Sequence, residues 1–387
     1  MRIVQVANFY GPRSGGIRTT MHSLAQGYAD LGHESVLVVP GPRDGDETTR
    51  FGRVVTLAAP SLPGSGGYRV ITDVDRVCTV LGELAPDRIE VSDRSSLRGI
   101  GWWARACGVP TVMWAHERID GVLRAFLPGR WPVTAMADSW NSATAARFDT
   151  VVCSTTYARE EFDRIGWTAL EQVPLGVDLE QFAPSRADDD LRADLLGDDD
   201  LLLVLCSRLS KEKRPGRAIA VLEQLRARGH RARLVVAGTG PMADRLAAHA
   251  QARQLPATFL GHVADRDRLS GLLASADVVL APGPIETFGL AALESLASGT
   301  PVVASKSSAL REIVVGDAGR VAADADPAFT DAVEDLLTVP AEVRRRASRL
   351  RAECFPWSET IDAMMRVHGL VEPPAVASTP SVNGVEL

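Results

Sequence analysis

The chain has 387 residues, of which 45% are hydrophobic and 24% charged, and its net charge is −7. At roughly 150 residues per domain, this length predicts two or three domains. The composition is that of an ordinary globular protein and excludes a wholly disordered chain, a collagen and a coiled coil. The negative net charge excludes a fold-wide basic surface for nucleic acid, so we expect no nucleic-acid partner.

The cysteines and the N-terminus indicate the cellular compartment of the protein. The 5 cysteines are odd in number, far apart and without zinc spacing, which favours reduced, intracellular thiols. The N-terminus has no apolar segment followed by a cleavage site, and prolines and glycines interrupt the longest uncharged stretch, residues 54–68. We therefore expect a soluble, cytoplasmic protein that touches a membrane at most peripherally.

The first half of the chain alternates between short apolar runs and helical patterns. In order, the patterns predict a strand at 2–7, a glycine-rich turn at 11–16, a helix at 19–31 that ends at Gly32, a strand at 35–39, a helix at 96–107, and strands at 109–114 and 150–153. Buried runs separated by helices are typical of parallel βαβ units.

The same alternation restarts after residue 200. Strands are predicted at 201–206, 232–237, 258–260, 278–281 and 301–304, with helices at 215–229 and 241–254. The fold class is therefore α/β, with two doubly wound domains whose ligand-binding cleft lies at the carboxyl ends of the strands.

We place the N-terminal domain at residues 1–172, a loop-like linker at 173–200, the C-terminal domain at 201–356, a C-terminal helix at 357–370 and a disordered tail at 371–387. The linker contains an acidic run at 188–190 and 198–200. Carboxylates bind hard cations, but a charge run on a linker is more often simply solvated.

Residues 281–301 carry the most informative pattern. Glu286 lies on a loop after a strand, and a helix is predicted at 289–298. The free backbone amides of Phe288, Gly289 and Leu290 at the helix start favour anions and hydroxyl oxygens. Glu294 lies about 1.5 turns into the helix, so both carboxylates can flank a polyhydroxylated ligand. Alternatively, Glu286 is a helix cap and Glu294 a surface residue.

This segment resembles the signature of the retaining glycosyltransferases of the GT4 family, with two glutamates separated by seven residues and a Gly-Thr-Pro-Val-Val sequence after them. Residues 173–178 with Phe182, 207–213, 238–241 and 259–261 are similar to other motifs of this family, in the same order. Ser207 and Arg214 stand where the family usually has glycine. The resemblance implies the GT-B fold, in which two Rossmann-like domains face each other across a cleft.

Four further segments look like those of actinobacterial GDP-mannose-dependent mannosyltransferases, namely residues 5–16, 90–94, 148–154 and 272–277. The subgroup that elongates phosphatidylinositol mannosides is the most similar. The resemblance implies transfer of α-mannose from GDP-mannose to a hydroxyl of a mannolipid or mannoside, with retention of configuration. A GT4 transferase with another donor, such as UDP-glucose, and a non-catalytic sugar-nucleotide-binding protein are the alternatives.

Two cations and two glycines are candidates for donor phosphate binding. Arg208 offers a fork of donors and Lys213 a point charge, and the resemblance implies that both hold the diphosphate. Together with helix N-termini they supply the positive field, so no metal ion or other cofactor is expected. Gly15 and Gly16 precede the first helix, where the absence of Cβ atoms lets the backbone approach a phosphate or a sugar.

The N-terminal half offers candidates near the reacting sugar and the acceptor. His116 follows the strand at 109–114, and the resemblance implies that it touches the reacting sugar, so it joins Arg208, Lys213 and Glu286 in the predicted catalytic set. The acceptor candidates, at another strand end, are Glu90, Asp93 and Arg94. Glu90 and Asp93 are expected to contact hydroxyls, and Arg94 a hydroxyl or a phosphate.

A lipid acceptor requires contact with the inner face of the plasma membrane. The aromatic and basic stretch at 118–131 is the candidate surface, and core or loop is the alternative interpretation.

Two rival patterns are weaker. Gly238-x-Gly240-x-x-Ala243 fits a nicotinamide dinucleotide fingerprint, but it lies mid-domain and lacks the acidic residue about 20 positions later. Asp-x-Asp pairs at 73–75 and 265–267 match the cation site of a metal-dependent transferase, but a second doubly wound domain argues against that fold.

Overall fold

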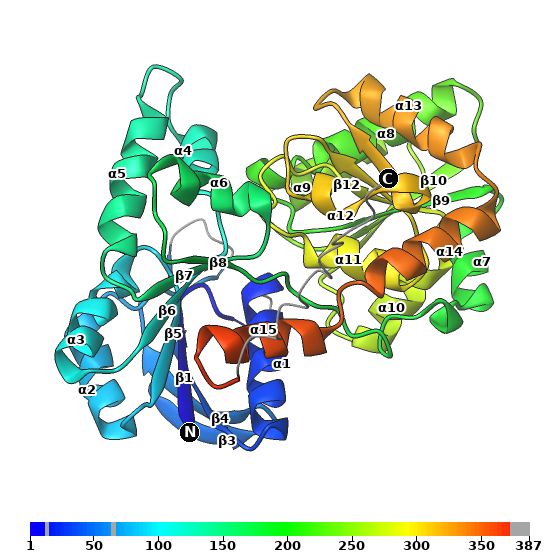
Figure 1. Ribbon diagram of the computed structural model, residues 1–387. Helices are drawn as coiled ribbons and strands as arrows, with labels where there is room; N and C mark the ends of the chain where they lie inside the picture. The colour runs from blue at the N-terminus through cyan, green and yellow to red at the C-terminus, as the bar shows by residue number, and fades with distance from the viewer. Residues whose placement is uncertain (12–14, 63–66, 372–387) are drawn as a thin grey trace, which may run out of the picture.

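The computed structural model describes residues 1–11, 15–62 and 67–371. They form two α/β lobes that lie side by side (Figure 1). The turn predicted at 11–16 falls partly outside the described residues, and so does the predicted tail beyond Val371.

Within the described residues, the first lobe is built on an eight-stranded sheet of order β3-β4-β2-β1-β5-β6-β7-β8. Its pairs are parallel except β3–β4. The chain runs outward from β1 in one direction and then returns to build the sheet in the other, as the doubly wound prediction requires. Its elements are β1 (Arg2–Ala7), α1 (Gly16–Asp30), β2 (Glu34–Gly41), β3 (Gly45–Thr49), β4 (Gly52–Ala58), α2 (Val74–Leu84), β5 (Arg88–Ser92), η1 (Ser96–Gly99), α3 (Ile100–Cys107), β6 (Thr111–Ala115), α4 (Ile119–Phe126), α5 (Val133–Ala145), β7 (Thr150–Cys153), α6 (Thr156–Arg164) and β8 (Leu170–Gln172).

The second lobe has a parallel six-stranded sheet of order β11-β10-β9-β12-β13-β14, with the strand order of a dinucleotide-binding fold. Its elements, with those of the connection before it and the helix after it, are η2 (Pro184–Arg186), α7 (Asp189–Leu196), β9 (Leu201–Cys206), η3 (Lys211–Lys213), α8 (Gly216–Ala227), β10 (Ala232–Ala237), α9 (Ala243–Ala252), β11 (Ala257–Gly261), α10 (Arg266–Ser275), β12 (Val278–Ala281), α11 (Leu290–Ala297), β13 (Val302–Ser305), α12 (Leu310–Ile313), η4 (Gly316–Ala318), β14 (Gly319–Ala322), α13 (Asp326–Leu337), α14 (Ala341–Ala352) and α15 (Trp357–Val367).

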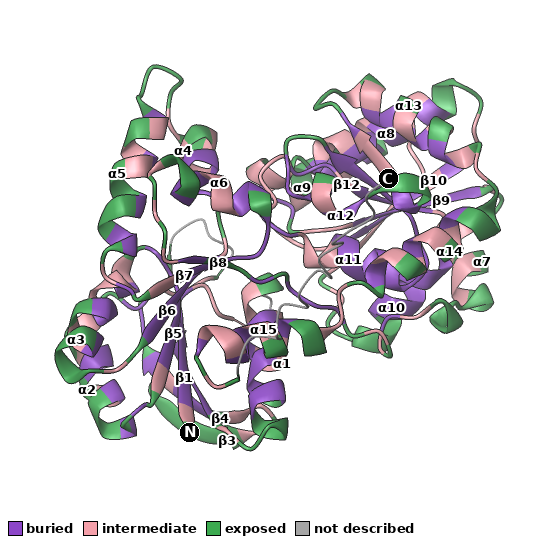
Figure 2. Cartoon of the chain, in the orientation of Figure 1, coloured by how far each residue is buried: buried purple, intermediate pink, exposed green. Residues whose placement is uncertain are grey.

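Successive residues of the central strands point to opposite faces of each sheet, and helices cover both faces. In β1, Ile3 packs in the same cluster as Leu24 of α1, whereas Val4 packs in the cluster that contains Leu81 of α2. Figure 2 shows the central strands as the most deeply buried layer of both lobes. Burial on both faces explains why these strands read as continuous apolar runs in the sequence.

The connection between the lobes differs from the predicted loop. The helix α7 begins inside the acidic run, where the Asp188 side chain accepts a hydrogen bond from the Leu191 amide at 2.9 Å. Asp189 and Asp190 occupy its first turn, where negative charge is favourable. Residues 188–190 of the run are therefore a helix N-terminus.

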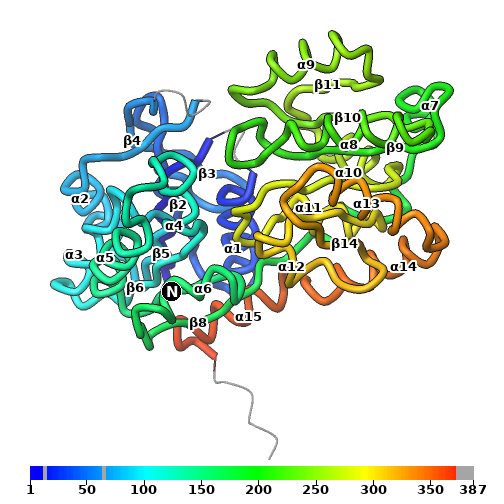
Figure 3. Tube along the Cα trace, turned by 90° about the horizontal axis from the view of Figure 1, so that it is seen from above, coloured from blue at the N-terminus to red at the C-terminus, as the bar shows by residue number. Residues whose placement is uncertain are grey.

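The last helix crosses back to the first lobe. Figures 1 and 3 show α15 beside α1, far from the second sheet. The contact is close, because a Cβ atom added at Gly27 of α1 would lie 2.1 Å from Cδ1 of Ile361. Gly27 is therefore required for the packing of these two helices.

Candidate active site

The predicted site residues follow the carboxyl ends of strands in both lobes. His116 follows β6 by one residue, Arg208 follows β9, and Glu286 lies on the loop after β12. In open α/β sheets, ligands bind at this edge, close to the point where the strand order reverses. Strands β9 and β12 flank that point in the second lobe.

Direct hydrogen bonds join the two lobes at this edge. The hydroxyl of Thr287, next to Glu286, donates to the backbone carbonyl of His116. The Thr155 and Ser154 hydroxyls donate to the Thr287 carbonyl at 2.8 Å and 3.3 Å. The structure thus holds the loop of Glu286 against the strand end of His116.

Lys213 and Glu286 form an ion pair between Nζ and Oε1. Both side chains are about one-quarter exposed. Lys213 ends the short helix η3, and a Cβ atom at Gly283 would lie 3.5 Å from its Cα atom. The sequence placed these residues in two different motifs, and the structure brings them into contact.

Arg208 reaches across to the first lobe. Its guanidinium carbon lies 5.1 Å from the ring centroid of Tyr68, and Nη2 lies 3.8 Å from Oε1 of Glu212. The side chain is 41% exposed, so it is accessible to a ligand. The Glu212 carboxylate is the only ion-pair partner of Arg208 among the described residues, and a guanidinium in this position can pair with a phosphate.

His116 is held by two residues of its own lobe. Its ring stacks on Trp114 at 5.5 Å, and Nε2 lies 2.9 Å from the Ser92 hydroxyl. Burial, with a smaller contribution from the nearby Arg94 charge, lowers the pKa of His116 to about 4. The imidazole is therefore neutral near pH 7 and can take part in hydrogen bonds without carrying charge.

Glu117 is a site residue that the sequence motifs did not assign. Its side chain is accessible to solvent, but protein surrounds it, and this burial raises the pKa of its carboxyl. Arg94 of its own lobe and Arg208 and Lys213 of the other lobe are close enough to oppose that rise. In the sequence, its position directly after His116 was the feature that could have indicated a place in the site.

The start of α11 presents backbone amides. Gly289 is its N-cap with φ of +87°, and a Cβ atom there would lie 2.6 Å from Leu310, so only glycine fits without strain. Among the described residues, no acceptor is assigned to the amides of Phe288, Gly289 and Leu290. These amides can receive ligand oxygens.

Glu294 lies deeper in the same helix and is 8% exposed. Its Oε1 accepts a hydrogen bond from Nη1 of Arg266 at 3.2 Å. Burial raises the pKa of this carboxyl, and the Arg266 charge opposes the rise. Arg266 in turn lies over the Phe182 ring, which connects the carboxylate to the segment between the lobes.

Glu90 is placed differently from the prediction. It is 1% exposed and lies within β5, where its carboxylate accepts hydrogen bonds from Tyr28 at 2.5 Å and Trp114 at 3.2 Å and bonds His368 at 2.8 Å. Asp93 is also buried and accepts from Asn8, Ser95 and the Leu97 amide. In this structure neither carboxylate is open to an acceptor hydroxyl.

Arg94 is buried as well, but it keeps spare donors. Nη1 donates to Asn141 at 2.9 Å and lies 3.4 Å from Glu161. Its Nε and Nη2 atoms have no hydrogen-bond partner among the described residues. Unpaired buried donors are uncommon, and an incoming anion would satisfy them.

Gly15 and Gly16 stand at the start of α1, with Gly15 as its N-cap. The φ of Gly15 is −85°, and a Cβ atom at either position would meet none of the described residues within 4 Å. Local structure therefore does not require glycine here. The described residues therefore leave room for close approach by a ligand at the helix start.

The rival motifs have structural explanations. Cβ atoms at Gly238 and Gly240 would lie 1.9 Å and 2.5 Å from the carbonyls of Ser207 and Leu209, so these glycines permit contact between two loops. Asp73 and Asp265 each accept hydrogen bonds as helix N-caps. Both Asp-x-Asp pairs are therefore explained as the starts of helices.

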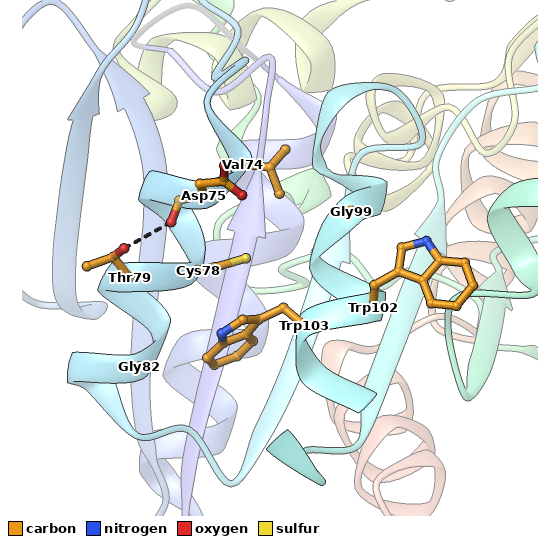
Figure 4. Close-up of a pocket in the computed structure, with 8 residues that line it drawn as sticks. All are labelled: Val74, Asp75, Cys78, Thr79, Gly82, Gly99, Trp102 and Trp103. Carbon is orange, nitrogen blue, oxygen red and sulfur yellow. Dashed lines mark hydrogen bonds between the residues drawn. The ribbon is translucent and has the colours of Figure 1, made fainter. Parts of the chain in front are cut away.

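A cavity of about 750 Å³ lies away from these residues, between α2 and α3 of the first lobe. Figure 4 shows Trp103 between the two helices and Trp102 pointing away from Cys78. None of the predicted site residues lines this cavity.

Two family models match the chain. One, described as a glycosyl transferase 4-like domain, matches residues 15–177, and one for glycosyl transferases group 1 matches residues 187–351. A GDP-mannose-dependent alpha-(1-6)-phosphatidylinositol dimannoside mannosyltransferase of Mycobacterium tuberculosis (strain ATCC 25177 / H37Ra) is 50% identical over 95% of this chain and 96% of its own length. The chain belongs to the GT4 family of glycosyltransferases.

More distant relatives and solved structures agree with this family and fold. A GDP-mannose-dependent alpha-mannosyltransferase of Mycolicibacterium smegmatis is 27% identical over 94% of this chain and 96% of its own. A sucrose-phosphate synthase from Thermosynechococcus elongatus superposes with a TM-score of 0.77 at 19% identity, over 95% of this chain and 98% of that chain. Anabaena HepE in complex with UDP and glucose superposes with a TM-score of 0.75 at 18% identity, over 95% of this chain and 99% of that chain. This glycosyltransferase therefore has the GT-B fold that the sequence predicted.

Within the described residues, this GT4 enzyme has no helix that is both long and apolar enough to cross a membrane.

Proposed function

We propose that this GT4 enzyme transfers mannose from GDP-mannose to a hydroxyl of a phosphatidylinositol mannoside, with retention of the α configuration. The observation that carries the proposal is the 50% identity, over 95% of the chain, to the mycobacterial phosphatidylinositol dimannoside mannosyltransferase. The cations and carboxylates gathered between the lobes support the same chemistry.

The donor diphosphate is held by Arg208 and Lys213. As the glycosidic bond breaks, negative charge grows on the departing phosphate, and fixed cations stabilise that charge more in the transition state than in the ground state. Lys213 now pairs with Glu286. When the diphosphate binds, the ammonium group gains a second anionic partner, and Glu286 remains near the sugar. The start of α1, with Gly15 and Gly16, closes on the donor from the other lobe.

The mannose hydroxyls meet Glu286 and the amides of Phe288, Gly289 and Leu290. Glu294 lies further along the helix and reaches the ribose diol of the nucleotide. His116, neutral near pH 7, donates or accepts a hydrogen bond at the reacting sugar. The departing diphosphate assists removal of the acceptor proton on the same face of the sugar, so no carboxylate nucleophile is needed. Arg208, Lys213 and the helix N-termini supply the positive field, and no metal ion is required.

The acceptor binds on the first lobe, with Arg94 as its anionic contact because two of its donors lack partners among the described residues. A lipid acceptor brings the enzyme to the inner face of the membrane. Of the stretch predicted for this contact, Arg118 is buried, whereas Phe126 and Trp131 are 68% and 47% exposed. The connection between α4 and α5 is therefore the surface that reaches the headgroups.

A donor panel followed by a transfer assay tests this function. Thermal shift with GDP, UDP, ADP and their sugars should give the largest stabilisation with GDP-mannose, because ligand binding to the native state raises the melting temperature. Radiolabelled mannose should then move to phosphatidylinositol dimannoside, and the anomeric coupling of the product should report an α linkage. A preference for UDP-glucose would favour the other-donor alternative, and binding without transfer to any acceptor would favour a non-catalytic protein.

A further inference from the structure

A second cavity, of about 520 Å³, lies between the lobes beside the loop of Glu286. Gly121 of α4 packs against Ile285 of the other lobe, where an added Cβ atom would lie 3.2 Å from Cγ2 of that isoleucine. The Tyr157 hydroxyl lies 3.5 Å from the carbonyl of Pro284. Residues of both lobes line the cavity, so a ligand in it would contact both lobes next to the candidate active site.

Arginines dominate the lining of this cavity. Its lining includes Arg118, Arg124, Arg214, Arg217 and Arg311. Four of these arginines lie within ion-pair distance of acidic residues, which are Asp120, Glu160, Asp324 and Asp326. One carboxylate, that of Asp120, is shared between Arg118 at 2.9 Å and Arg124 at 3.7 Å. Five guanidinium groups against four carboxylates leave an excess of positive charge.

Arg214 carries that excess. No hydrogen bond or ion pair of its side chain is found among the residues that the structure describes, and the residue is exposed. Its backbone has φ of +50° and ψ of +44°, the left-handed conformation that favours glycine. This is the position where the related GT4 motif usually has glycine. A strained arginine at a glycine position, aimed at a cavity rich in arginine, indicates that the side chain has a use there.

Arg124 lines the same cavity from the first lobe. Its side chain is 58% exposed, and Nη2 donates to Thr134 at 3.0 Å, which leaves most of its fork available. A phosphate group matches two guanidinium forks better than a carboxylate does, because three oxygens can accept charge-assisted hydrogen bonds from both sides.

We propose that this cavity is a phosphate-binding site, separate from the donor diphosphate site, in which Arg214 of one lobe and Arg124 of the other hold one phosphate group. The group belongs either to the acceptor lipid, whose headgroup phosphate then fixes the position of the reacting hydroxyl, or to a free phosphate ester. The first source rests on the proposed function, and the second does not.

Binding is measured first, without catalysis. The enzyme is saturated with GDP so that the diphosphate site is filled, and inorganic phosphate is titrated by calorimetry. Wild-type enzyme should bind one phosphate, and Arg214→Gly and Arg124→Ala should each weaken this binding at least 10-fold. Arg214→Gly relieves the left-handed strain, so its melting temperature should not fall. Lys211→Ala, which removes an exposed cation three residues away, is the matched control and should bind phosphate as the wild type does.

Transfer kinetics separate the two sources. If the acceptor supplies the phosphate, Arg214→Gly should raise the KM for phosphatidylinositol mannoside at least 10-fold and leave the KM for GDP-mannose unchanged. If both KM values stay unchanged while phosphate binding is lost, the ligand is a free phosphate ester. Failure of mannose transfer would contradict the proposed function and leave the calorimetric result standing. Absence of phosphate binding to GDP-saturated wild type, or equal binding by Arg214→Gly, would overturn the phosphate site.

Discussion

His368 Nε2 lies 2.8 Å from Oε1 of Glu90, although 278 residues separate them in the chain. The histidine follows α15, and the glutamate lies in β5, so this hydrogen bond fastens the end of the described chain inside the first lobe. Trp114, whose indole also donates to Glu90, stacks on His116. The buried contact therefore lies one layer beneath the candidate active site.

Loss of this contact should destabilise the protein. His368→Ala leaves the buried Glu90 carboxylate without one partner, which costs about 1–3 kcal/mol. The free energy of unfolding, measured by urea denaturation, should fall by that amount. His249→Ala on the exposed face of α9 is the control and should change it by less than about 0.5 kcal/mol. Equal stability of the two variants would show that the contact contributes nothing.

The two cations assigned to the diphosphate should be needed for turnover rather than for folding. Arg208→Ala and Lys213→Ala should each lower kcat by at least ~100-fold, the scale expected when one stabilising group for developing charge is lost. Both side chains are partly exposed, so circular dichroism spectra should match the wild type. Lys211→Ala should keep full activity. Rates near wild type in both variants would remove the diphosphate assignment.

The central strands and the main motif could be predicted because their signals are local. Strands β9 and β12 are continuous apolar runs, and the structure has them at the predicted residues 201–206 and 278–281. Glu90 could not be placed correctly, because the sequence does not give the strand register. It pairs with Gln5 in the middle of β5, so its side chain points onto the face of the sheet rather than toward the cleft.

The sequence motifs could not predict contacts between segments that are distant in the chain. His368 lies in no motif, and its partner is in the other half of the chain. The pairing of Lys213 with Glu286 depends on how two loops of the second sheet meet, which only the packing of β9 beside β12 determines. The departure of Arg214 from glycine was visible in the sequence, but its left-handed backbone and the cavity beside it were not.

The two glutamates of the main motif should affect different steps. Glu294→Gln should raise the KM for GDP-mannose and weaken GDP binding, because a ribose contact is equally strong in the ground and transition states. Glu286→Gln should lower kcat and leave GDP affinity nearly unchanged, since GDP lacks the sugar. Calorimetric titration of GDP into both variants distinguishes them. The opposite pattern would exchange the two roles, and no effect in either variant would make the motif structural.

Chelation should leave the reaction intact. In the proposed mechanism, Arg208, Lys213 and the start of α11 provide the charge stabilisation that a divalent cation supplies in other transferases. Initial rates with excess EDTA should therefore equal those with added magnesium. Activity that disappears with EDTA and returns only with magnesium or manganese would show that the reaction depends on a metal ion.

The protonation of His116 should stay constant over the physiological range. Burial and the Arg94 charge lower its pKa to about 4, so the imidazole remains neutral from pH 5 to pH 8. In the unfolded chain a histidine titrates near pH 6.5. Between about pH 6.5 and pH 4 the unfolded state therefore binds more protons, and stability falls as the pH decreases through this window. Above pH 6.5 the contribution is constant, and below pH 4 both states are protonated.

NMR titration of the histidine ring protons measures this directly. His22 has a pKa that is also lowered to about 4, so two resonances should titrate near pH 4. His116→Asn should remove one of them, which assigns the other to His22. The same variant should lose less stability than the wild type between pH 6.5 and pH 4, because it lacks the group that must be kept neutral. A His116 resonance that titrates near pH 6.5 would mean that the ring is charged during part of the physiological range, and its role as a neutral hydrogen-bonding group would then fail.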